Sequence, residues 1–465
     1  MKYLSKLIIA LLLTAGITTA GCSDLLNPST PQSKPIESVQ NVDDLSGLMN
    51  GAYSRLGQTP LYGRDYVVLG DVRTGNAWSN GYSGRFVNSS MLQVTPQASL
   101  GIWDAAYEVI SNTNIIINSD VEGEGVGQIK GQAYAVRALS HMMLLKMYGQ
   151  QSVDGSDLGI PYVTTFGERE NFFPSRPTID QTLAKIEADY LRAIDLLDPS
   201  VTGPKPTMTY YAAQALLSRF YLFAGNYQGA SEAAKEVIDS GVYSLVPASE
   251  YVAAWASDGE PSVIFEIDMN TTDSRGSNSI FQILRGEAYG DVEVTEELFN
   301  LFGPNDVRND LYGTEVTSAD GASARVNYRV VAKFQDQYKN TPVIRYAEVI
   351  LNYAEAQARL GNLVEALTYL NMIPSNRNAT TYTAVTQAAL VDNILLERRK
   401  ELAMEGLYYW QLMRTGQGIT RTGMRQDVSS NEVTVPYGNP RLAYPIPIQE
   451  MDANPNMQQN AGYGG

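Results

Sequence analysis

The chain has 465 residues, of which 44% are hydrophobic and 18% are charged, a composition that excludes a disordered protein and fits a folded one. Its formal net charge of −16 excludes a nucleic-acid partner, because phosphates require a basic surface. Tyrosine outnumbers phenylalanine by 29 to 11, so many of the aromatic rings carry one polar end. Such rings suit a groove for polar ligands or a large amphipathic helical surface, and composition alone favours the second.

Residues 1–21 have the pattern of a signal peptide. Lys2 and Lys6 precede a short apolar core at Leu7–Leu13, and small residues follow up to Gly21. The apolar stretch Leu7–Ala20 has 14 residues, too few to cross a bilayer comfortably. The pattern therefore predicts a secretory signal and an exported chain.

Cys22 is the only cysteine in the chain, so it cannot form an internal disulfide. The small residues before it look like a bacterial lipobox, although Thr19 stands where that pattern prefers leucine. We therefore expect a lipoprotein signal over 1–21, lipidation of Cys22 and a flexible, Pro/Ser-rich tether over 22–40. The alternative is an ordinary signal peptide with an incidental cysteine.

Helical periodicity dominates the rest of the chain. Ile129–Tyr148 has apolar residues at offsets 0, 3, 7 and 11 from Val136, a spacing that predicts a helix, and the helix is expected to end at Gly149. A second helix is predicted from Ile179, after the capping box formed by Thr178 and Gln181.

Two segments repeat one plan of helix, Gly-Asn turn and helix. They are Tyr210–Ile238 and Val349–Pro374, and in each the turn glycine is followed five residues later by alanine. A small residue at that place lets two helices approach closely, as in tetratricopeptide hairpins. The sequence thus predicts a mostly α fold with tetratricopeptide-like hairpins.

Four insertions interrupt this helical pattern and are expected to form loops or short strands. They cover Arg64–Gln97, Gly149–Pro177, Asp258–Arg345 and Gly416–Tyr444. The third includes the β-type run SVIFEIDM and the longer stretch Gly313–Val331. Loops of this kind are where function is expected.

Signals of catalysis are few. His141 is the only histidine and lies in the apolar stretch ALSHMMLLKMYG, which favours a packed structural role over that of a base. GEGVGQ at Gly123 fails the dinucleotide-binding spacing, because Gln128 stands where the last glycine belongs. A carboxylate pair for glycoside hydrolysis stays open, since it depends on distances in space. We expect no catalytic residue.

No metal site or cofactor is expected either. With one histidine and one cysteine, zinc sites built on these residues are excluded. The acidic loops Asp120–Gly125 and Val153–Gly159 could hold Ca²⁺, but neither fits the EF-hand spacing, and solvated loops are favoured.

The segment Leu395–Gly406 is dense in charges of alternating sign. Glu397 with Glu401, and Arg398 with Glu405, share helical faces where ion pairs can form. A catalytic glutamate is one interpretation, and a buried or half-buried structural network is the favoured one.

Several segments, in order, resemble the SusD/RagB family of Bacteroidetes outer-membrane lipoproteins. The resemblance covers nearly the whole mature chain, from CSDLLNPSTP through IWDAAYEVISNTNIIIN to AYPIPIQEMDANPNMQQNAGY. Its most specific part is TPVIRYAEVILNYAEAQARLGN followed by ERRKELAMEGLYYWQLMR. Two departures, Leu407 and Gln411, fall on a helix that we expect to be structural.

The resemblance implies a surface-exposed, non-catalytic binding protein with a SusD-like fold. Residues 41–257 would form an N-terminal helical region with the hairpins, and residues 258–465 a C-terminal SusD/RagB region. Members of the family sit over a SusC-like TonB-dependent transporter and pass oligosaccharides to it, or peptides in some cases. The implied location is the outer membrane, reached through the lipid on Cys22.

Ligand contacts are expected from exposed aromatic rings and polar side chains in loops. Trp103 and Trp410 lie in helical blocks and are expected in the core, whereas the position of Trp255 is ambiguous. Trp78 lies in the glycine-rich stretch LGDVRTGNAWSNGYSGRF, without apolar periodicity to bury it, although it could also tuck under its own loop. The candidates are two ring platforms, four hydrogen-bonding groups and a second cluster: Trp78 and Tyr82; Asp71, Arg73, Asn76 and Asn80; Arg285 and Tyr289.

Three alternatives to glycan capture remain open at this stage. The first is a RagB-like, peptide-capturing lipoprotein, and the second is an exported glycosidase. The third is a scaffold that only braces the transporter.

Overall fold

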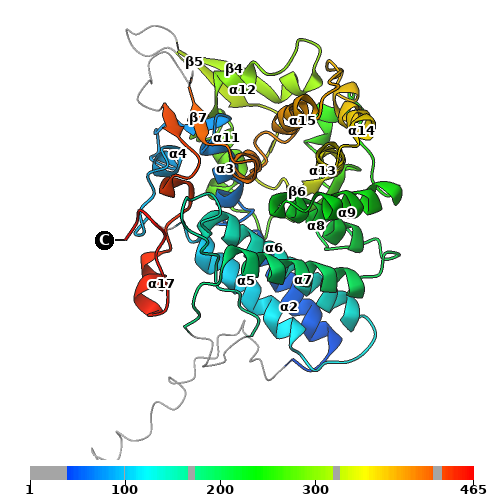
Figure 1. Ribbon diagram of the computed structural model, residues 1–465, viewed down its shortest axis with the longest axis vertical. Coiled ribbons are helices and arrows are strands. Elements are labelled where there is room, and N and C mark those ends of the chain that lie inside the picture. The colour runs from blue at the N-terminus through cyan, green and yellow to red at the C-terminus, as the bar shows by residue number, and fades with distance from the viewer. Residues whose placement is uncertain (1–38, 99, 166–172, 318–324, 423–431, 465) are drawn as a thin grey trace, which may run out of the picture.

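The computed structural model describes residues 39–98, 100–165, 173–317, 325–422 and 432–464, and the fold within them is mostly helical (Figure 1). The predicted signal peptide, Cys22 and nearly all of the predicted tether lie outside the described residues. The α-helices are α2 (Val42–Leu56), α3 (Asp65–Val72), α4 (Val87–Ser90), α5 (Ile102–Ile117), α6 (Val126–Tyr148), α7 (Ile179–Leu196), α8 (Tyr210–Ala224), α9 (Tyr227–Asp239), α10 (Tyr251–Ala254), α11 (Ile280–Leu284), α12 (Glu296–Phe299), α13 (Tyr346–Arg359), α14 (Leu363–Ser375), α15 (Gln387–Glu401), α16 (Tyr408–Arg414) and α17 (Ile448–Ala453). Short 3₁₀ turns are η3 (Gly276–Asn278), η4 (Val307–Leu311) and η6 (Pro440–Leu442).

The helices pack in a continuous series. Helices α2, α5, α6 and α7 lie side by side at one end, followed by α8 and α9, then α13, α14 and α15 (Figure 1). Local sequence explains where helix α7 begins. Thr178 Oγ1 accepts from the Gln181 amide at 3.2 Å, and Gln181 Oε1 accepts from the Thr178 amide at 3.0 Å. The predicted capping box is therefore confirmed, and the predicted helix 129–148 begins three residues earlier, at Val126.

Both predicted helical hairpins are confirmed as α8–α9 and α13–α14. Their turn glycines, Gly225 and Gly361, have φ of +76° and +88°, a left-handed backbone that strains any residue with a Cβ. Ala230 and Ala366, five residues on, are fully buried between packed helices. The small side chain thus allows the close approach that the repeat predicted.

In the described part of the chain, the strands form three small antiparallel sheets. They are β1 (Ala77–Ser79), β2 (Val263–Ile267), β3 (Val292–Val294), β4 (Tyr312–Thr317), β5 (Arg325–Val330), β6 (Thr341–Arg345), β7 (Ile419–Arg421) and β8 (Val433–Val435). The largest has the order β1-β3-β5-β4, and β2 pairs with β6 and β7 with β8. The strands expected between 258 and 345 are confirmed, but this insertion also contains helices α11 and α12, and 64–97, expected as loop or strand, also forms helices α3 and α4.

A buried network of charges holds the C-terminal helices to the sheets. The alternating charges of Leu395–Gly406 predicted such a network. We call it the Glu401 network. Its side chains are at most a tenth exposed and belong to Asp306, Arg308, Lys333, Arg345, Arg377, Glu397, Lys400, Glu401 and Glu405.

Glu401, the last residue of α15, is the centre of this network. Its carboxylate accepts from Arg377 at 3.0 Å, from Arg345 at 3.2 Å and from Arg308 at 3.3 Å. Burial alone would raise the pKa of Glu401, but Arg377, Arg345 and Arg308 outweigh it and hold the pKa below its usual range. The carboxylate is therefore charged in the folded protein, and it is the common partner of cations from three segments.

We predict that Glu401→Gln lowers the free energy of unfolding by about 3–5 kcal/mol, because it leaves buried cations without their partner. Denaturant unfolding followed by circular dichroism measures this. Since the folded pKa lies below the unfolded value of 4.5, the contribution is present at neutral pH and is lost as the pH falls below about 4.5.

The matched control is Glu236→Gln, at an exposed position on helix α9, which should change stability by no more than about 0.5 kcal/mol. Equal stability of Glu401→Gln and Glu236→Gln would contradict the central role of Glu401.

Candidate functional site

Two exposed tyrosines that the sequence placed in separate clusters lie on neighbouring loops at one end of the largest sheet. Strand β1 pairs with β3, with Trp78 opposite Glu293, so the chain leaving β1 runs beside the chain entering β3. Tyr82 is 62% exposed and Tyr289 is 49% exposed, high values for tyrosine in the described chain. We call the area around Tyr82, Arg85 and Tyr289 the tyrosine surface.

Hydrogen bonds fix the first loop against the second. The Asn80 amide donates to the Asp291 carbonyl at 3.0 Å, and Asn80 Nδ2 donates to the Gly290 carbonyl at 2.7 Å and to Glu293 at 3.0 Å. Asn80 Oδ1 in turn accepts from the amide of Tyr82 at 3.1 Å. Asn80 is half-buried and fully engaged, so it positions the tyrosine rather than offering itself to a ligand.

Arg85 connects the two tyrosine loops and was not among the residues predicted from sequence. Its guanidinium lies over the Tyr289 ring, 4.9 Å from the centroid, and pairs with Asp291 at 3.1 Å. A cation over one face of Tyr289 restrains that ring. The signal that could have found Arg85 is its place three residues after Tyr82 in the same glycine-rich loop.

The guanidinium of Arg285, the other residue of the predicted second cluster, is largely occupied by hydrogen bonds within the protein. Its guanidinium donates to Glu287 at 2.8 Å and to the Val331 carbonyl. The side chain is 12% exposed. Arg285 therefore braces the Tyr289 loop against the end of β5.

Trp78, the leading sequence candidate, is fully buried in β1, so the prediction that it stands exposed in a loop is wrong. Asp71, Arg73 and Asn76 are also buried, with at most 1% of each exposed. Segments distant in the sequence explain the difference: β1, which holds Trp78, pairs with β3, and α16 and the C-terminal segment pack on α3 and contact Asp71 and Arg73. A polar, glycine-rich stretch gives no local sign of that cover.

These buried polar residues join the segment before β1 to the C-terminal region. The Arg73 guanidinium lies between the rings of Tyr409 and Tyr444, 4.1 and 4.4 Å from their centroids. Asp71 accepts from Asn76 at 2.8 Å and from the Gly406 amide at 2.8 Å. Burial raises the pKa of Asp71 to about 6.

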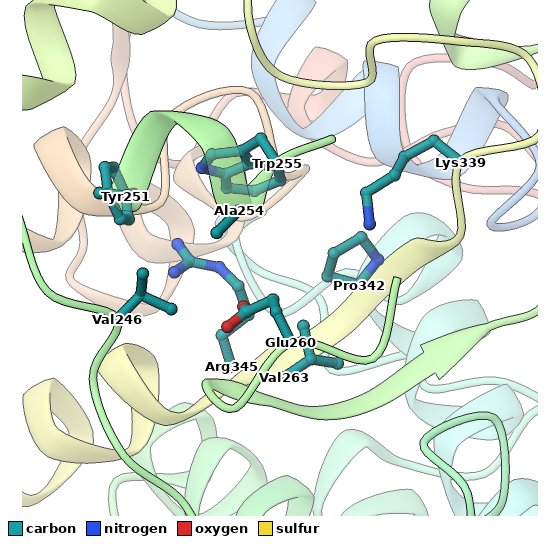
Figure 2. Close-up of a pocket in the computed structure, with 9 residues that line it drawn as sticks. All are labelled: Val246, Tyr251, Ala254, Trp255, Glu260, Val263, Lys339, Pro342 and Arg345. Atoms are coloured by element: carbon teal, nitrogen blue, oxygen red, sulfur yellow. The ribbon is translucent and has the colours of Figure 1, made fainter. Parts of the chain in front are cut away.

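Trp255, whose place the sequence left ambiguous, is buried at a pocket of about 280 Å³ (Figure 2). The amine of Lys333 lies 4.5 Å from the ring centroid and the Arg345 guanidinium 5.2 Å from it. Both cations belong to the Glu401 network. Trp103 and Trp410 are confirmed in the hydrophobic core, and Trp255 belongs to the same core at the point where it contacts the Glu401 network.

His141 is confirmed as a packed structural residue. It is fully buried, its ring stacks on Tyr162 with centroids 3.8 Å apart, and Nε2 accepts from the Val163 amide at 3.2 Å. Burial lowers the pKa of His141 well below its usual value. The imidazole is therefore neutral and engaged on both nitrogens, since Nδ1 lies 3.0 Å from the Arg137 carbonyl.

Across the described residues, no group of three or more His, Cys, Asp or Glu side chains is arranged to hold a metal ion. Within the same part of the chain, no helix combines the length and the apolar character needed to span a bilayer.

Comparison with known proteins gives matches along most of the chain. A family model described as "SusD family" matches residues 324–463, and one described as "Starch-binding associating with outer membrane" matches residues 24–222. A curated relative, SusD-like protein P2 of Formosa agariphila, is 25% identical, and the alignment covers 96% of this chain and 98% of the relative.

Solved structures agree with these matches. A SusD superfamily protein from Bacteroides vulgatus has a TM-score of 0.83 at 28% identity, covering 92% of this chain and 100% of that one. Another from Bacteroides thetaiotaomicron has a TM-score of 0.80 at 29% identity, covering 90% and 99%. The mostly helical, SusD-like fold expected from the sequence is thereby confirmed.

We predict that substitutions at Trp78 and Tyr82, four residues apart, differ greatly in their effect on stability. Trp78→Ala should lower the free energy of unfolding by about 3–5 kcal/mol, because it empties a filled interior site. Tyr82→Ala should change it by no more than about 0.5 kcal/mol, because the ring is exposed. Guanidinium unfolding curves of the two variants test this, and a similar loss in both would show that Tyr82 is packed rather than presented.

Proposed function

Because the chain belongs to the SusD family, we propose that it captures oligosaccharides at the outer-membrane surface and passes them to a SusC-like TonB-dependent transporter. The description of one matching family model, "Starch-binding associating with outer membrane", supports both the class of ligand and the location. Capture of this kind requires binding and release without bond cleavage, and we include no catalytic step.

The observation that carries the proposal is the tyrosine surface. The apolar C–H face of a sugar packs on an aromatic ring, and its hydroxyls meet polar groups at the ring's edge. Tyr82 and Tyr289 supply two exposed rings on adjacent loops, and Arg85 lies beside them as a donor only partly occupied by Asp291. Each such contact contributes about 0.5–3 kcal/mol, so a site with few of them binds weakly and releases readily.

Rigid support strengthens this assignment. Asn80 and the β1–β3 pairing hold the two loops together before any ligand arrives. A site formed in advance loses less conformational entropy when it binds. Weak individual contacts are therefore sufficient for capture.

We predict that Tyr82→Ala and Tyr289→Ala each weaken oligosaccharide binding about tenfold, since one stacked ring is worth about 1.4 kcal/mol. Isothermal titration against a panel of neutral oligosaccharides identifies the ligand and then measures both variants. The matched control is Tyr227→Ala: Tyr227 on α9 also carries an arginine over its ring, at 5.5 Å, but lies on a helical hairpin.

Binding that is unchanged in both tyrosine variants would remove the tyrosine surface from the proposal. Binding of peptides without binding of any oligosaccharide would replace glycan capture with peptide capture. Release of shorter sugars from a polysaccharide by the purified protein would identify a glycosidase instead.

Membrane attachment is proposed to depend on Cys22, which lies outside the described residues. We predict that Cys22→Ala leaves the fold unchanged and releases the protein into the soluble fraction, because the lipid is attached to that thiol. Fractionation of cells that lack the transporter measures this directly. Continued membrane association of the variant in those cells would contradict the lipid anchor.

A further inference from the structure

A buried cavity among helices α3, α6, α7 and α8 is lined by an unusual set of polar groups. Its free space is about that of one water molecule, and its polar lining consists of Tyr62, Tyr66, Lys146, Tyr190 and Arg219. Tyr62, Tyr66, Lys146 and Tyr190 are each at most 5% exposed, and the rest of the lining is methionine, leucine and phenylalanine. None of the residues that line this cavity belongs to the tyrosine surface.

Lys146 is the least expected member of this set. Within the described residues, no carboxylate lies within ion-pair distance of its ammonium, and it donates no hydrogen bond to another residue; its amine lies 5.7 Å from the centroid of the Phe223 ring. The hydroxyls of Tyr62, Tyr66 and Tyr190 likewise have no hydrogen-bond partner among those residues. Buried polar groups are nearly always paired, so four of them around one cavity indicate something that they bind.

Neighbouring charges leave Lys146 uncompensated. Arg219 uses both oxygens of Glu348, at 2.7 and 2.6 Å, and Arg414 uses both oxygens of Glu355, at 2.6 Å each. Arg398 lies 3.8 Å from Glu348 and 4.0 Å from Glu355. Lys146, Arg219, Arg398 and Arg414 thus carry four positive charges against two carboxylates, and the surplus lies beside the cavity.

Size limits the occupant. The free space at the centre of the cavity is about that of one water molecule, too small for a sugar or a phosphate. An occupant that satisfies one ammonium and three hydroxyl donors must accept hydrogen bonds, and the surplus of positive charge favours an anion over water.

We propose that this cavity binds a single monatomic anion, chloride under physiological conditions. Lys146 supplies the charge, and the hydroxyls of Tyr62, Tyr66 and Tyr190 donate hydrogen bonds to it. The anion neutralises part of the interior where α3, α6, α7 and α8 meet, and so it stabilises the fold independently of any oligosaccharide.

The first test locates the anion. Crystals of the protein soaked in sodium bromide should show an anomalous peak beside Lys146 Nζ, because bromide replaces chloride. A Lys146→Met crystal soaked in the same way should lack it. Density of a water molecule without an anomalous peak in the unsubstituted protein would overturn the proposal.

The second test measures stability by the melting temperature. Replacing gluconate with chloride at constant ionic strength should raise Tm by roughly 1–2 °C at ten times the dissociation constant. Lys146→Met should fold, because an apolar side chain replaces an unpaired buried charge, and should lose this response. Lys235→Met, which removes the same charge from a surface ion pair on α9, should keep it.

The response should also depend on pH. Burial, reinforced by the positive charges of Arg219, Arg414 and Arg398 and opposed by Glu348, lowers the pKa of Lys146 to about 7. Anion binding requires the protonated amine, so the chloride effect should be present at pH 6 and largely lost at pH 8.5. A chloride effect that Lys146→Met retains, or one that is absent from the unsubstituted protein at pH 6, would overturn the proposal.

Discussion

The pairing of the Glu401 carboxylate with three arginines is the interaction on which the rest of the structure depends. Arg308 lies in η4, directly before β4, and Lys333 follows β5 closely and pairs with Glu405 of the same network. The network therefore holds both strands of the β4–β5 hairpin at its open end, where the chain enters β4 and leaves β5. Strand β3 pairs with β5, and β1 pairs with β3. The loop of Tyr82 follows β1 and the loop of Tyr289 precedes β3, so both loops are positioned by strands of the sheet that the network holds in place. Charges in the interior thus determine where two rings meet solvent.

The two kinds of polar interior differ in how they are satisfied. In the Glu401 network each cation meets a carboxylate directly, so the protein completes its own pairing. Around Lys146 the protein leaves donors that face a cavity. Direct pairing stabilises a connection between distant segments, whereas an incomplete set of donors makes part of the interior dependent on the solvent's ions.

Sequence predicted the features that depend on neighbours along the chain. The capping box at Thr178, the hairpin glycine Gly225 and the charged end of α15 all have local signatures, and all were found as expected. Trp78 was misplaced because it lies in β1, a strand whose partner β3 is distant in the sequence and gives no local sign near Trp78. Tyr82 and Tyr289 were each nominated correctly as exposed rings, but only the pairing of β1 with β3 shows that they belong to one surface.

The position of Arg73 between Tyr409 and Tyr444 has a consequence for the order of events during biogenesis. Arg73 also donates to the carbonyl of Leu442, a contact that spans 369 residues. A nascent chain has made nearly all of its length before these partners exist, so α3 cannot acquire its final surroundings during synthesis. Completion of the fold therefore waits for the C-terminal segment, and α3 and the segment before β1 reach their final packing among the last parts of the protein.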